Sequence, residues 1–275
     1  MLEWNHVDGL SHRNNAMKFG LCTKIDELPL VEKAGFDYIE PTVATVLPDK
    51  PDQDFEPVAR AVAASRIKAE AFNVFVPGTI KITGPAASLD TLRKYVSVVA
   101  PRVARLGGRV IVFGSGGARR VPDGFPMAKA MDQLAAFLDA IAPIAATAKI
   151  TIAIEPLHKG ECNIINLVKE GLELATRVNK PAVRALADLF HIGQEKEPYK
   201  NVAATGAMLA HVHIAHPISR MCPLPGDGCD YKLFFRAIKE AGYNGRISIE
   251  SAWQDQWKQA PISLDYLRTE WEKAS

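Results

Sequence analysis

The chain has 275 residues, of which 48% are hydrophobic and 23% are charged, so it is long enough for one large α/β barrel or two small globular domains. Its 33 basic and 31 acidic residues give a net charge of +2, which excludes the strongly basic surface typical of proteins that bind nucleic acid or anionic membranes. We therefore expect neither kind of partner.

The first sixteen residues differ from the rest of the chain. They are polar, contain His6 and His12, and lack the apolar segment of a signal peptide. We expect residues 1–16 to be an N-terminal extension, disordered or derived from an expression vector, before a catalytic domain at residues 17–275. The cysteines show no zinc-type CxxC spacing, so we expect free thiols in a cytoplasmic protein.

Short apolar runs alternate with longer amphipathic segments from residue 17 onward. The expected strands are 18–22, 36–40, 67–74, 109–114, 150–155, 183–188, 210–215 and 247–251. Helical spacing of apolar residues lies between them, at 56–64, 89–106, 128–148 and 233–241. Pro101 should kink or split the second of these helices, and Gly242 is placed to end the fourth.

Strands that alternate with helices predict parallel pairing through right-handed crossovers. Eight such units in this length predict a single-domain (β/α)8 TIM barrel. A doubly wound open sheet is the alternative, but no GxGxxG follows the first expected strand, and a count of eight favours closure.

Four possible metal ligands follow apolar runs in the second half of the chain. They are Glu155, Asp188, His213 and Glu250. Because active sites of parallel barrels form where the C-terminal ends of the strands converge, we expect these side chains to meet. Three carboxylates and one imidazole suit a divalent ion such as Mn²⁺, Mg²⁺ or Co²⁺. Each glutamate taken alone could equally be an ion-pair partner or a helix cap.

Two histidines on one expected strand compete for the ligand position. His211 and His213 are two residues apart and face the same side of the strand. His213 lies nearer the C-terminal end and is the better ligand, whereas His211 should lie one layer deeper as a core residue or as a partner of a ligand. His216 falls in the following loop and is a weaker candidate.

These residues occur within longer motifs that resemble a known superfamily. The motifs are Glu155-Pro-Leu-His-Lys-Gly-Glu161, Asp188-Leu-Phe-His191, His211-Val-His213 with Arg220 and Pro225-Gly-Asp-Gly228 beyond it, and Ile249-Glu-Ser251. Together they resemble the xylose isomerase-like sugar isomerase/epimerase superfamily, and most of all its ketose 3-epimerase branch, the D-tagatose and D-psicose 3-epimerases.

The resemblance implies roles for the individual residues. Glu155, Asp188, His213 and Glu250 would ligate one metal ion, Mn²⁺ foremost, with Co²⁺ or Mg²⁺ as alternatives. Glu155 and Glu250 would also be the catalytic acid/base pair. For substrate binding, Glu161 would contact hydroxyl groups and orient Glu155, while His191 would bind substrate. A dimer or tetramer of identical chains is implied as well.

Two positions depart from the pattern of that branch. Its substrate-clamping arginine usually lies six residues after the ligand histidine, where this chain has Ser219, so that Arg220 comes one residue later. His158 stands where an asparagine is expected. Both departures indicate a pocket shaped for a different sugar.

The ligand set and the resemblance together predict a sugar isomerase. One glutamate would remove a proton beside a ketose carbonyl, and the other would return a proton on the opposite face through a cis-enediolate whose charge the metal stabilises. An aldose–ketose isomerase and a dehydratase of a cyclic keto-polyol or a dehydroshikimate-type acid begin in the same way. An apurinic endonuclease would need further histidines near strands three and four, and a binding barrel would need no catalysis.

Two other features carry open interpretations. Val112–Val121 is rich in glycine and contains Arg119 and Arg120, which could bind a phosphate or carboxylate or could be solvated residues of a tight turn. Glu40 ends the second expected strand at the same mouth of the barrel, where it would contact substrate or pair with a neighbouring side chain.

Overall fold

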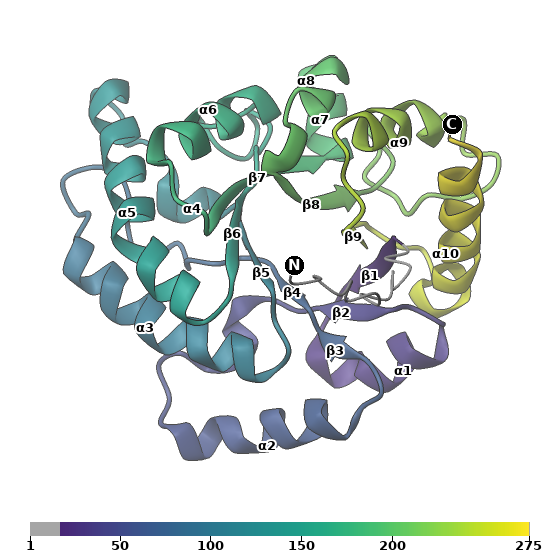
Figure 1. Ribbon diagram of the computed structural model, residues 1–275, viewed down its shortest axis with the longest axis horizontal. Helices are drawn as coiled ribbons and strands as arrows, with labels where there is room; N and C mark the ends of the chain where they lie inside the picture. Colours follow the sequence, from purple (N-terminus) through teal and green to yellow (C-terminus); the bar gives the residue numbers. More distant parts are fainter. Residues whose placement is uncertain (1–16, 275) are drawn as a thin grey trace, which may run out of the picture.

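The computed structural model describes residues 17–274, so the expectation about residues 1–16 lies outside the described residues. Its centre is a sheet in the order β3-β2-β1-β9-β8-β7-β6-β5-β4, and every pairing in it is parallel. The strands are β1 (Lys18–Cys22), β2 (Tyr38–Glu40), β3 (Lys68–Ala69), β4 (Ala71–Phe72), β5 (Val110–Phe113), β6 (Thr151–Ile154), β7 (Val183–Asp188), β8 (Leu209–Ile214) and β9 (Arg246–Ile249). Helices surround them in Figure 1.

The barrel has eight strand positions around its ring, because β3 and β4 are two parts of one expected strand. Glu70 separates them, and its carbonyl accepts hydrogen bonds from the backbone N–H groups of Arg109 and Val110. Since β2 pairs with β3 and β4 pairs with β5, the chain through Glu70 completes the ring. The prediction of a TIM barrel is therefore confirmed, with the third strand broken at one residue.

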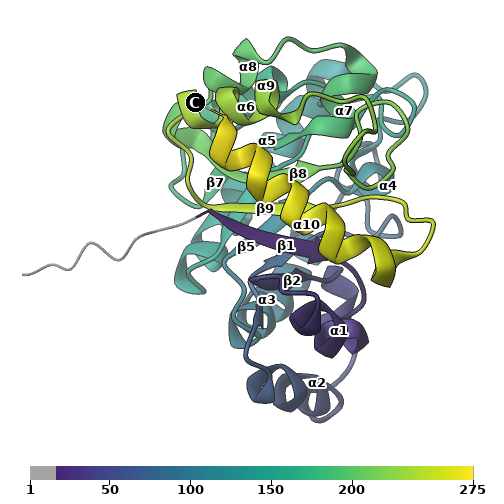
Figure 2. The same cartoon turned by 90° about the vertical axis from the view of Figure 1, so that its right-hand side faces the viewer.

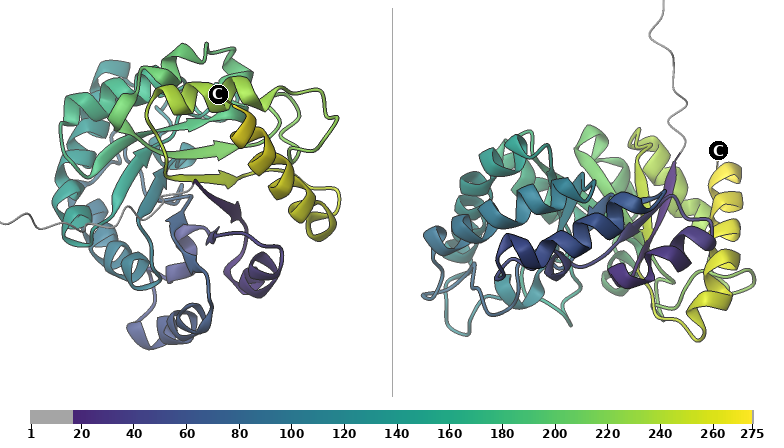
Figure 3. Two further views of the ribbon diagram at one scale, coloured as in Figure 1. Left: turned by 45° about the vertical axis from the view of Figure 1, so that its right-hand side comes forward. Right: turned by 90° about the horizontal axis from the view of Figure 1, so that it is seen from below.

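Helices form the outer layer of the barrel, as Figure 3 shows from two further sides. They are α1 (Leu28–Lys33), α2 (Asp52–Ala64), α3 (Leu89–Arg105), α4 (Gly116–Arg119), α5 (Met127–Thr147), α6 (Val168–Val178), α7 (Leu189–Glu195), α8 (Lys200–Ala203), α9 (Tyr231–Glu240) and α10 (Gln256–Lys273). Short 3-10 turns lie at Ile25–Glu27, Val43–Val46 and Gly206–Met208. In Figure 2, α10 crosses the outside of β1 and β9.

Helix boundaries differ from the sequence prediction at two prolines. The helix expected at 56–64 begins four residues earlier, at Asp52, so Pro57 lies in its second turn instead of its first. Pro101 does not split α3, which runs unbroken from Leu89 to Arg105. In both helices, packing of the apolar face against the barrel outweighs the one backbone hydrogen bond that a proline removes.

The end of α9 is where glycine was predicted to stop the helix. Gly242 has φ +72°, its N–H bonds to the carbonyl of Lys239, and the N–H of Tyr243 bonds to the carbonyl of Ile238. This pair of bonds satisfies carbonyls that a helix end leaves free, and the left-handed conformation costs glycine little. The chain then turns directly into β9.

Apolar side chains form two separate cores. The larger one fills the space between the strands and the surrounding helices, and the smaller one lies inside the barrel. The interior cluster consists of Tyr38, Ala71, Val110, Val112, Ala153 and Leu186. The barrel is thus a packed body beneath its mouth, and the polar side chains at the strand ends have a rigid base.

Tyr38 fills the interior next to a residue without a side chain. A Cβ atom on Gly20 would lie 2.3 Å from two carbons of the Tyr38 ring, which is inside van der Waals contact. The Tyr38 hydroxyl and Ser248 Oγ are 2.6 Å apart. Glycine at position 20 therefore allows a large ring, with a hydrogen-bonded hydroxyl, to occupy the barrel.

Within residues 17–274, no helix is both long and apolar enough to cross a membrane.

Gly20→Ala should destabilise the protein by about 1–3 kcal/mol, because the added methyl group overpacks the barrel interior against the ring of Tyr38. Urea unfolding measures the change in the free energy of unfolding. The double variant Gly20→Ala/Tyr38→Leu should lose less than the sum of the two single variants, because the smaller side chain leaves room for the methyl group. Additive losses would contradict this packing.

Candidate active site

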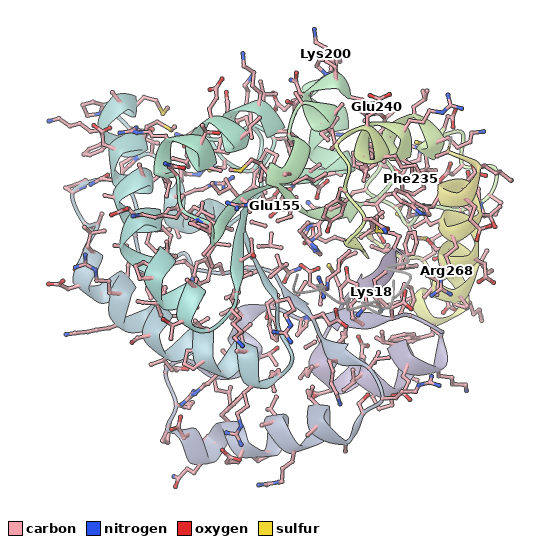
Figure 4. All side chains as sticks on the ribbon, in the orientation of Figure 1. Lys18, Glu155, Lys200, Phe235, Glu240 and Arg268 are labelled. Carbon is pink, nitrogen blue, oxygen red and sulfur yellow. The ribbon has the colours of Figure 1, made fainter. Side chains whose placement is uncertain are left out.

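Four side chains meet at the C-terminal ends of adjacent strands. Glu155 follows β6, Asp188 ends β7, His213 lies near the end of β8, and Glu250 follows β9, so neighbouring strands supply one residue each. A nitrogen or oxygen of each lies within 4.8 Å of one from every other member. Figure 4 shows Glu155 on the inner side of the ring of helices. We call these residues the tetrad.

His213 is at the centre of the tetrad. Its Nδ1 atom lies 3.0 Å from Glu155 Oε1 and 3.7 Å from both Asp188 Oδ2 and Glu250 Oε2. The other ring nitrogen, Nε2, lies 2.9 Å from Glu40 Oε1. Because Glu40 takes Nε2, the ring presents Nδ1 to the three carboxylates.

Glu40 joins the barrel interior to the tetrad. It is fully buried, and its second oxygen, Oε2, lies 2.8 Å from His211 Nε2 and accepts a hydrogen bond from Ser248 Oγ. Burial would raise the pKa of Glu40, but His213 and His211 lower it well below the usual range. Of the two interpretations of Glu40, pairing with neighbours describes the structure, and His211 lies one layer below His213.

Asp188 is held by the first turn of α7. Its Oδ1 atom accepts hydrogen bonds from the backbone N–H groups of Phe190 (2.7 Å) and His191 (3.1 Å). This N-cap fixes the carboxylate and leaves Oδ2 for the tetrad. One residue thus ends a strand, starts a helix and supplies an oxygen to the site.

The two glutamates of the tetrad have different surroundings. A Cβ on Gly114 would lie 2.1 Å from Glu155 Oε2, so this glycine makes room for the carboxylate. Glu250 accepts a hydrogen bond from Asn73 Nδ2 at 3.1 Å, and its other oxygen lies 2.9 Å from Arg220 Nη2. Glu155 is almost fully buried, whereas the Glu250 side chain is 21% exposed.

The cluster of carboxylates changes the acidity of its members. Burial raises the pKa of Glu155 to about 7, with Glu250 and Asp188 adding to the rise and the hydrogen bond from His213 opposing it. Burial would lower the pKa of His213, but the carboxylates of Glu40, Glu250 and Glu155 raise it well above its usual value. In this protein the imidazole therefore supplies the positive charge that the carboxylates need.

Glu161, His191 and Arg220, predicted to bind substrate, lie together beside the tetrad. Arg220 Nη1 is 2.6 Å from Glu161 Oε1, so this arginine bridges Glu161 and Glu250, and its guanidinium lies 4.8 Å from the centre of the Phe190 ring. His191 is buried, and its ring stacks on that of His158.

The hydrogen bonds of the two histidines define their tautomers. His191 Nδ1 accepts from the backbone N–H of His158 at 3.1 Å, and His158 Nδ1 accepts from the N–H of Gly160 at 3.2 Å. Each ring therefore carries its proton on Nε2. His158, His191 and Glu161 also lie close enough together for a metal site, but in this arrangement both Nδ1 atoms accept backbone hydrogen bonds and both Nε2 atoms carry protons.

His191 Nε2–H has no hydrogen-bond partner among the described residues, and Asp188 Oδ2 lies 4.0 Å from it. Burial lowers the pKa of His191 to about 3, so the ring is neutral at physiological pH. A neutral N–H that is buried and unpaired costs free energy until an acceptor arrives. A hydrogen-bond acceptor placed beside this ring would satisfy the donor.

A cavity of about 210 Å³ lies against these groups. Glu155, Glu161, His191, Arg220 and Glu250 line it on one side, and Val74, Val76, Leu157 and four glycines form much of the rest. Pockets for drug-sized ligands are larger, roughly 300–1,000 Å³. The volume and the polar wall fit a small, hydroxyl-rich molecule.

The glycine-rich segment is neither an anion site nor a solvated turn at Arg119. Its guanidinium is fully buried and donates to the backbone carbonyls of Phe113 and Glu155, each at 2.7 Å. Arg120 is exposed and donates to the carbonyl of Glu161 at 2.7 Å. Neither the anion site nor the turn with solvated arginines anticipated that both side chains bind backbone carbonyls.

Sequence reasoning also missed Asn73 and Ser248. Each is a polar residue in an otherwise apolar strand segment, a signal present in the sequence but weak by itself. Asn73 and Ser115 follow strands three and four, where an endonuclease would need histidines; Asn73 bonds to Glu250, and Ser115 Oγ accepts from the N–H of Val76.

Comparison with known proteins agrees with this architecture. The sequence profile of the family described as "Xylose isomerase-like TIM barrel" matches residues 28–270. L-Ribulose 3-epimerase of Methylomonas sp. (strain DH-1) is 34% identical over 117 residues, which are 42% of this chain and 40% of that protein. D-Psicose 3-epimerase of Agrobacterium fabrum is 27% identical over 115 residues, 41% of this chain and 39% of that protein. The matches thus span about two fifths of the length of these curated relatives.

Solved structures extend the likeness over nearly the whole chain. A D-psicose 3-epimerase crystallised in the presence of D-fructose superposes with a TM-score of 0.82 at 20% identity, covering 93% of this chain and 99% of that one. A 3-keto-D-glucoside 4-epimerase from E. coli gives 0.78 at 20% identity, covering 92% and 99%. At this identity the superpositions establish the fold.

Glu155 should make the metal-free protein less stable as the pH rises. Its pKa is about 7 in the folded protein against 4.5 for an ordinary glutamate, so between these values the folded state holds a proton that the unfolded state has released. The stabilisation is complete below the unfolded pKa and is lost as the pH passes the folded pKa. The loss is at most about 3 kcal/mol.

Urea unfolding in the presence of a chelator, at about pH 5 and about pH 8, measures this effect in the wild type and in Glu155→Gln. The variant cannot titrate at this position, so its free energy of unfolding should fall less than that of the wild type. Parallel losses in the two proteins would show that Glu155 titrates normally.

Proposed function

The chain belongs to the xylose isomerase-like TIM barrel family, and we propose that it is a divalent-metal-dependent epimerase of ketose sugars. The observation that carries the proposal is the placement of two glutamates. Glu155 follows β6 and Glu250 follows β9, so the strands that bear Asp188 and His213 lie between them. Two carboxylates on opposite sides of one site suit the removal of a proton from one face of a carbon and its return on the other.

The tetrad fits a divalent metal ion. Three carboxylates and one imidazole are a donor set for Mn²⁺, Mg²⁺ or Co²⁺, and we propose Mn²⁺ as the native ion. Glu40 holds His213 Nε2, so Nδ1 is the ligand atom, and the cap on Asp188 leaves Oδ2 as its ligand. A glutamate that burial and its neighbours drive toward protonation gains most from a bound cation.

Glu155 and Glu250 are the proposed acid/base pair. When bound, the ion supplies Lewis-acid stabilisation of negative charge on a substrate oxygen, which makes a neighbouring C–H bond acidic enough to break. Glu155 or Glu250 then accepts the proton, and the other glutamate donates a proton to the opposite face of the planar carbon. Each acts as a positioned general acid or base, worth on the order of 10²–10⁴ in rate.

The remaining wall of the cavity is the proposed binding surface for substrate hydroxyl groups. His191 Nε2–H donates to one of them, and Glu161, which is ion-paired with Arg220, accepts from another. Arg220 and His158 occupy the positions that depart from the ketose 3-epimerase pattern, and we propose that they adapt the pocket to a particular sugar.

The charge of the cavity favours an uncharged sugar over a sugar phosphate. Glu155, Glu161 and Glu250 line it, whereas Arg220 is the one cation of its described lining and is already paired with two of these carboxylates. A phosphate dianion would meet carboxylates without a free cation to bind it. We therefore expect a free ketose of monosaccharide size.

Incubation with free ketohexoses and pentuloses in D₂O after loading with Mn²⁺ tests the proposal, with NMR as the readout. We expect deuterium to enter beside the carbonyl only in the loaded protein, together with a product inverted at that carbon. Glu155→Gln and Glu250→Gln should each lower the rate by about 10²–10⁴-fold or more. Glu197→Gln is the matched control, because Glu197 is also a buried carboxylate but caps α6 through the backbone N–H groups of Val168 and Lys169.

Other products would redirect or refute the proposal. A shifted carbonyl would identify an aldose–ketose isomerase, and loss of water would identify a dehydratase of a keto-polyol. Exchange that persists at the wild-type rate in either tetrad variant would refute the two-base mechanism. Failure to exchange any ketose with metal bound would refute the epimerase activity.

A further inference from the structure

Arg119 is the largest side chain that is fully buried in the described part of the chain, and it lies directly behind the candidate active site. It ends α4, the single helical turn that follows β5. A buried guanidinium is costly unless its donors are satisfied, so its hydrogen bonds reveal what it does. One of these hydrogen bonds goes to the backbone carbonyl of Glu155.

The guanidinium joins three segments of chain. Nη1 donates to the carbonyl of Phe113 at the end of β5, and Nη2 donates to the carbonyl of Glu155, both at 2.7 Å. Nη2 also lies 3.3 Å from the carbonyl of Ile165, in the loop between β6 and α6. The Phe113 ring lies beneath, 5.5 Å from the guanidinium carbon.

The backbone of Glu155 is thereby held on both sides of its Cα atom. Its N–H donates to the carbonyl of Phe113 at 3.2 Å, and its carbonyl accepts from Arg119. The side chain leaves this fixed peptide through the space beside Gly114 and reaches His213. Two hydrogen bonds thus hold the backbone from which the carboxylate extends to the tetrad.

Arg120 makes the equivalent contact to the second functional glutamate of this region. Its Nη2 atom donates to the carbonyl of Glu161 at 2.7 Å, while the Glu161 side chain pairs with Arg220 in the cavity. Gly116, at the start of α4, lies close to the same loop, since a Cβ there would be 3.3 Å from the Glu161 carbonyl. Adjacent arginines therefore contact the backbone of the two glutamates that follow β6.

We propose that Arg119 and Arg120 are positioning residues of the active site: Arg119 fixes the backbone of Glu155, and Arg120 fixes that of Glu161. Functional carboxylates need placement within about 0.5 Å, which backbone anchors provide. The inference rests on the proposed function for the roles of the two glutamates. It predicts distinct consequences, since Glu155 belongs to the tetrad and Glu161 only to the substrate wall.

Arg119→Met and Arg119→Lys test the first half of the proposal. We expect Arg119→Met to weaken Mn²⁺ binding, followed by titration calorimetry, and to lower kcat, each by about 10–100-fold. Arg119→Lys, which can replace part of the hydrogen bonding, should lie between Arg119→Met and the wild type. Arg120→Ala should raise KM for the ketose and leave Mn²⁺ affinity unchanged.

Arg102→Met is the matched structural control. Arg102 is also buried and also donates to backbone carbonyls, those of Val46, Leu47 and Lys50, but these belong to the segment before α2 and do not line the cavity. Arg102→Met should lower the melting temperature, as we expect for Arg119→Met. It should leave Mn²⁺ affinity and kcat within about twofold of the wild type, because effects at separate sites are independent.

A spectroscopic readout needs neither metal nor substrate. In the metal-free protein the His213 Nδ1–H proton is bonded to Glu155, so its low-field NMR signal should be present in the wild type and in Arg102→Met, and shifted or lost in Arg119→Met. If the wild type binds Mn²⁺ but converts no sugar, the proposed function fails, while metal affinity and this signal still test Arg119.

The proposal is overturned if folded Arg119→Met keeps wild-type Mn²⁺ affinity and an unchanged His213 signal. It is overturned equally if Arg102→Met causes the same losses, because the effect would then be one of general stability. Should Arg119→Met not fold, Arg119→Lys and Arg120→Ala decide the matter by the same measurements, and wild-type behaviour of both would refute it.

Discussion

The burial of several carboxylates around one imidazole is the constraint on which the rest of this structure depends. Glu155, Asp188 and Glu40 are almost completely withdrawn from solvent, and isolated carboxylates there would be prohibitively costly. His213 contacts all of them, with one ring nitrogen toward Glu40 and the other toward the tetrad. Its raised pKa follows from this position, as does the affinity for a divalent cation that we propose. The site is assembled to hold positive charge.

Backbone contacts position two of these carboxylates, those of Asp188 and Glu155. Asp188 is fixed by the N–H groups at the start of α7, and Glu155 by an N–H bond to Phe113 and a carbonyl bond from Arg119. Glycine at position 114 leaves the space through which the Glu155 side chain passes. The polar site thus takes its geometry from strand ends and from the short turns that follow them. Tyr38 and Ser248 connect this arrangement to the packed interior below.

The tetrad shows why part of the site could be predicted from the sequence. Glu155, Asp188, His213 and Glu250 each follow an apolar run, and a parallel barrel brings such positions together whatever the loops between them do. Strand order brings the four residues to one mouth of the barrel, and their side chains meet there within 4.8 Å. The role of Arg119 could not be predicted, since an arginine in a glycine-rich turn is expected to be exposed. Its side chain is buried because α4 packs closely against the loop after β6. The pairing of Glu40 with His211 and His213 likewise joins strands far apart in the sequence.

The barrel, its eight strands and the four strand-end residues were predictable from the sequence, because apolar periodicity and strand-end chemistry are local properties that the parallel topology combines in one way. Contacts between distant segments account for the break of the third strand at Glu70, the unbroken course of α3 through Pro101, and the tautomers of His158 and His191. They also explain why both arginines of the glycine-rich turn bind backbone carbonyls. These features depend on which groups from distant segments come within hydrogen-bonding distance, and that distance is set by packing.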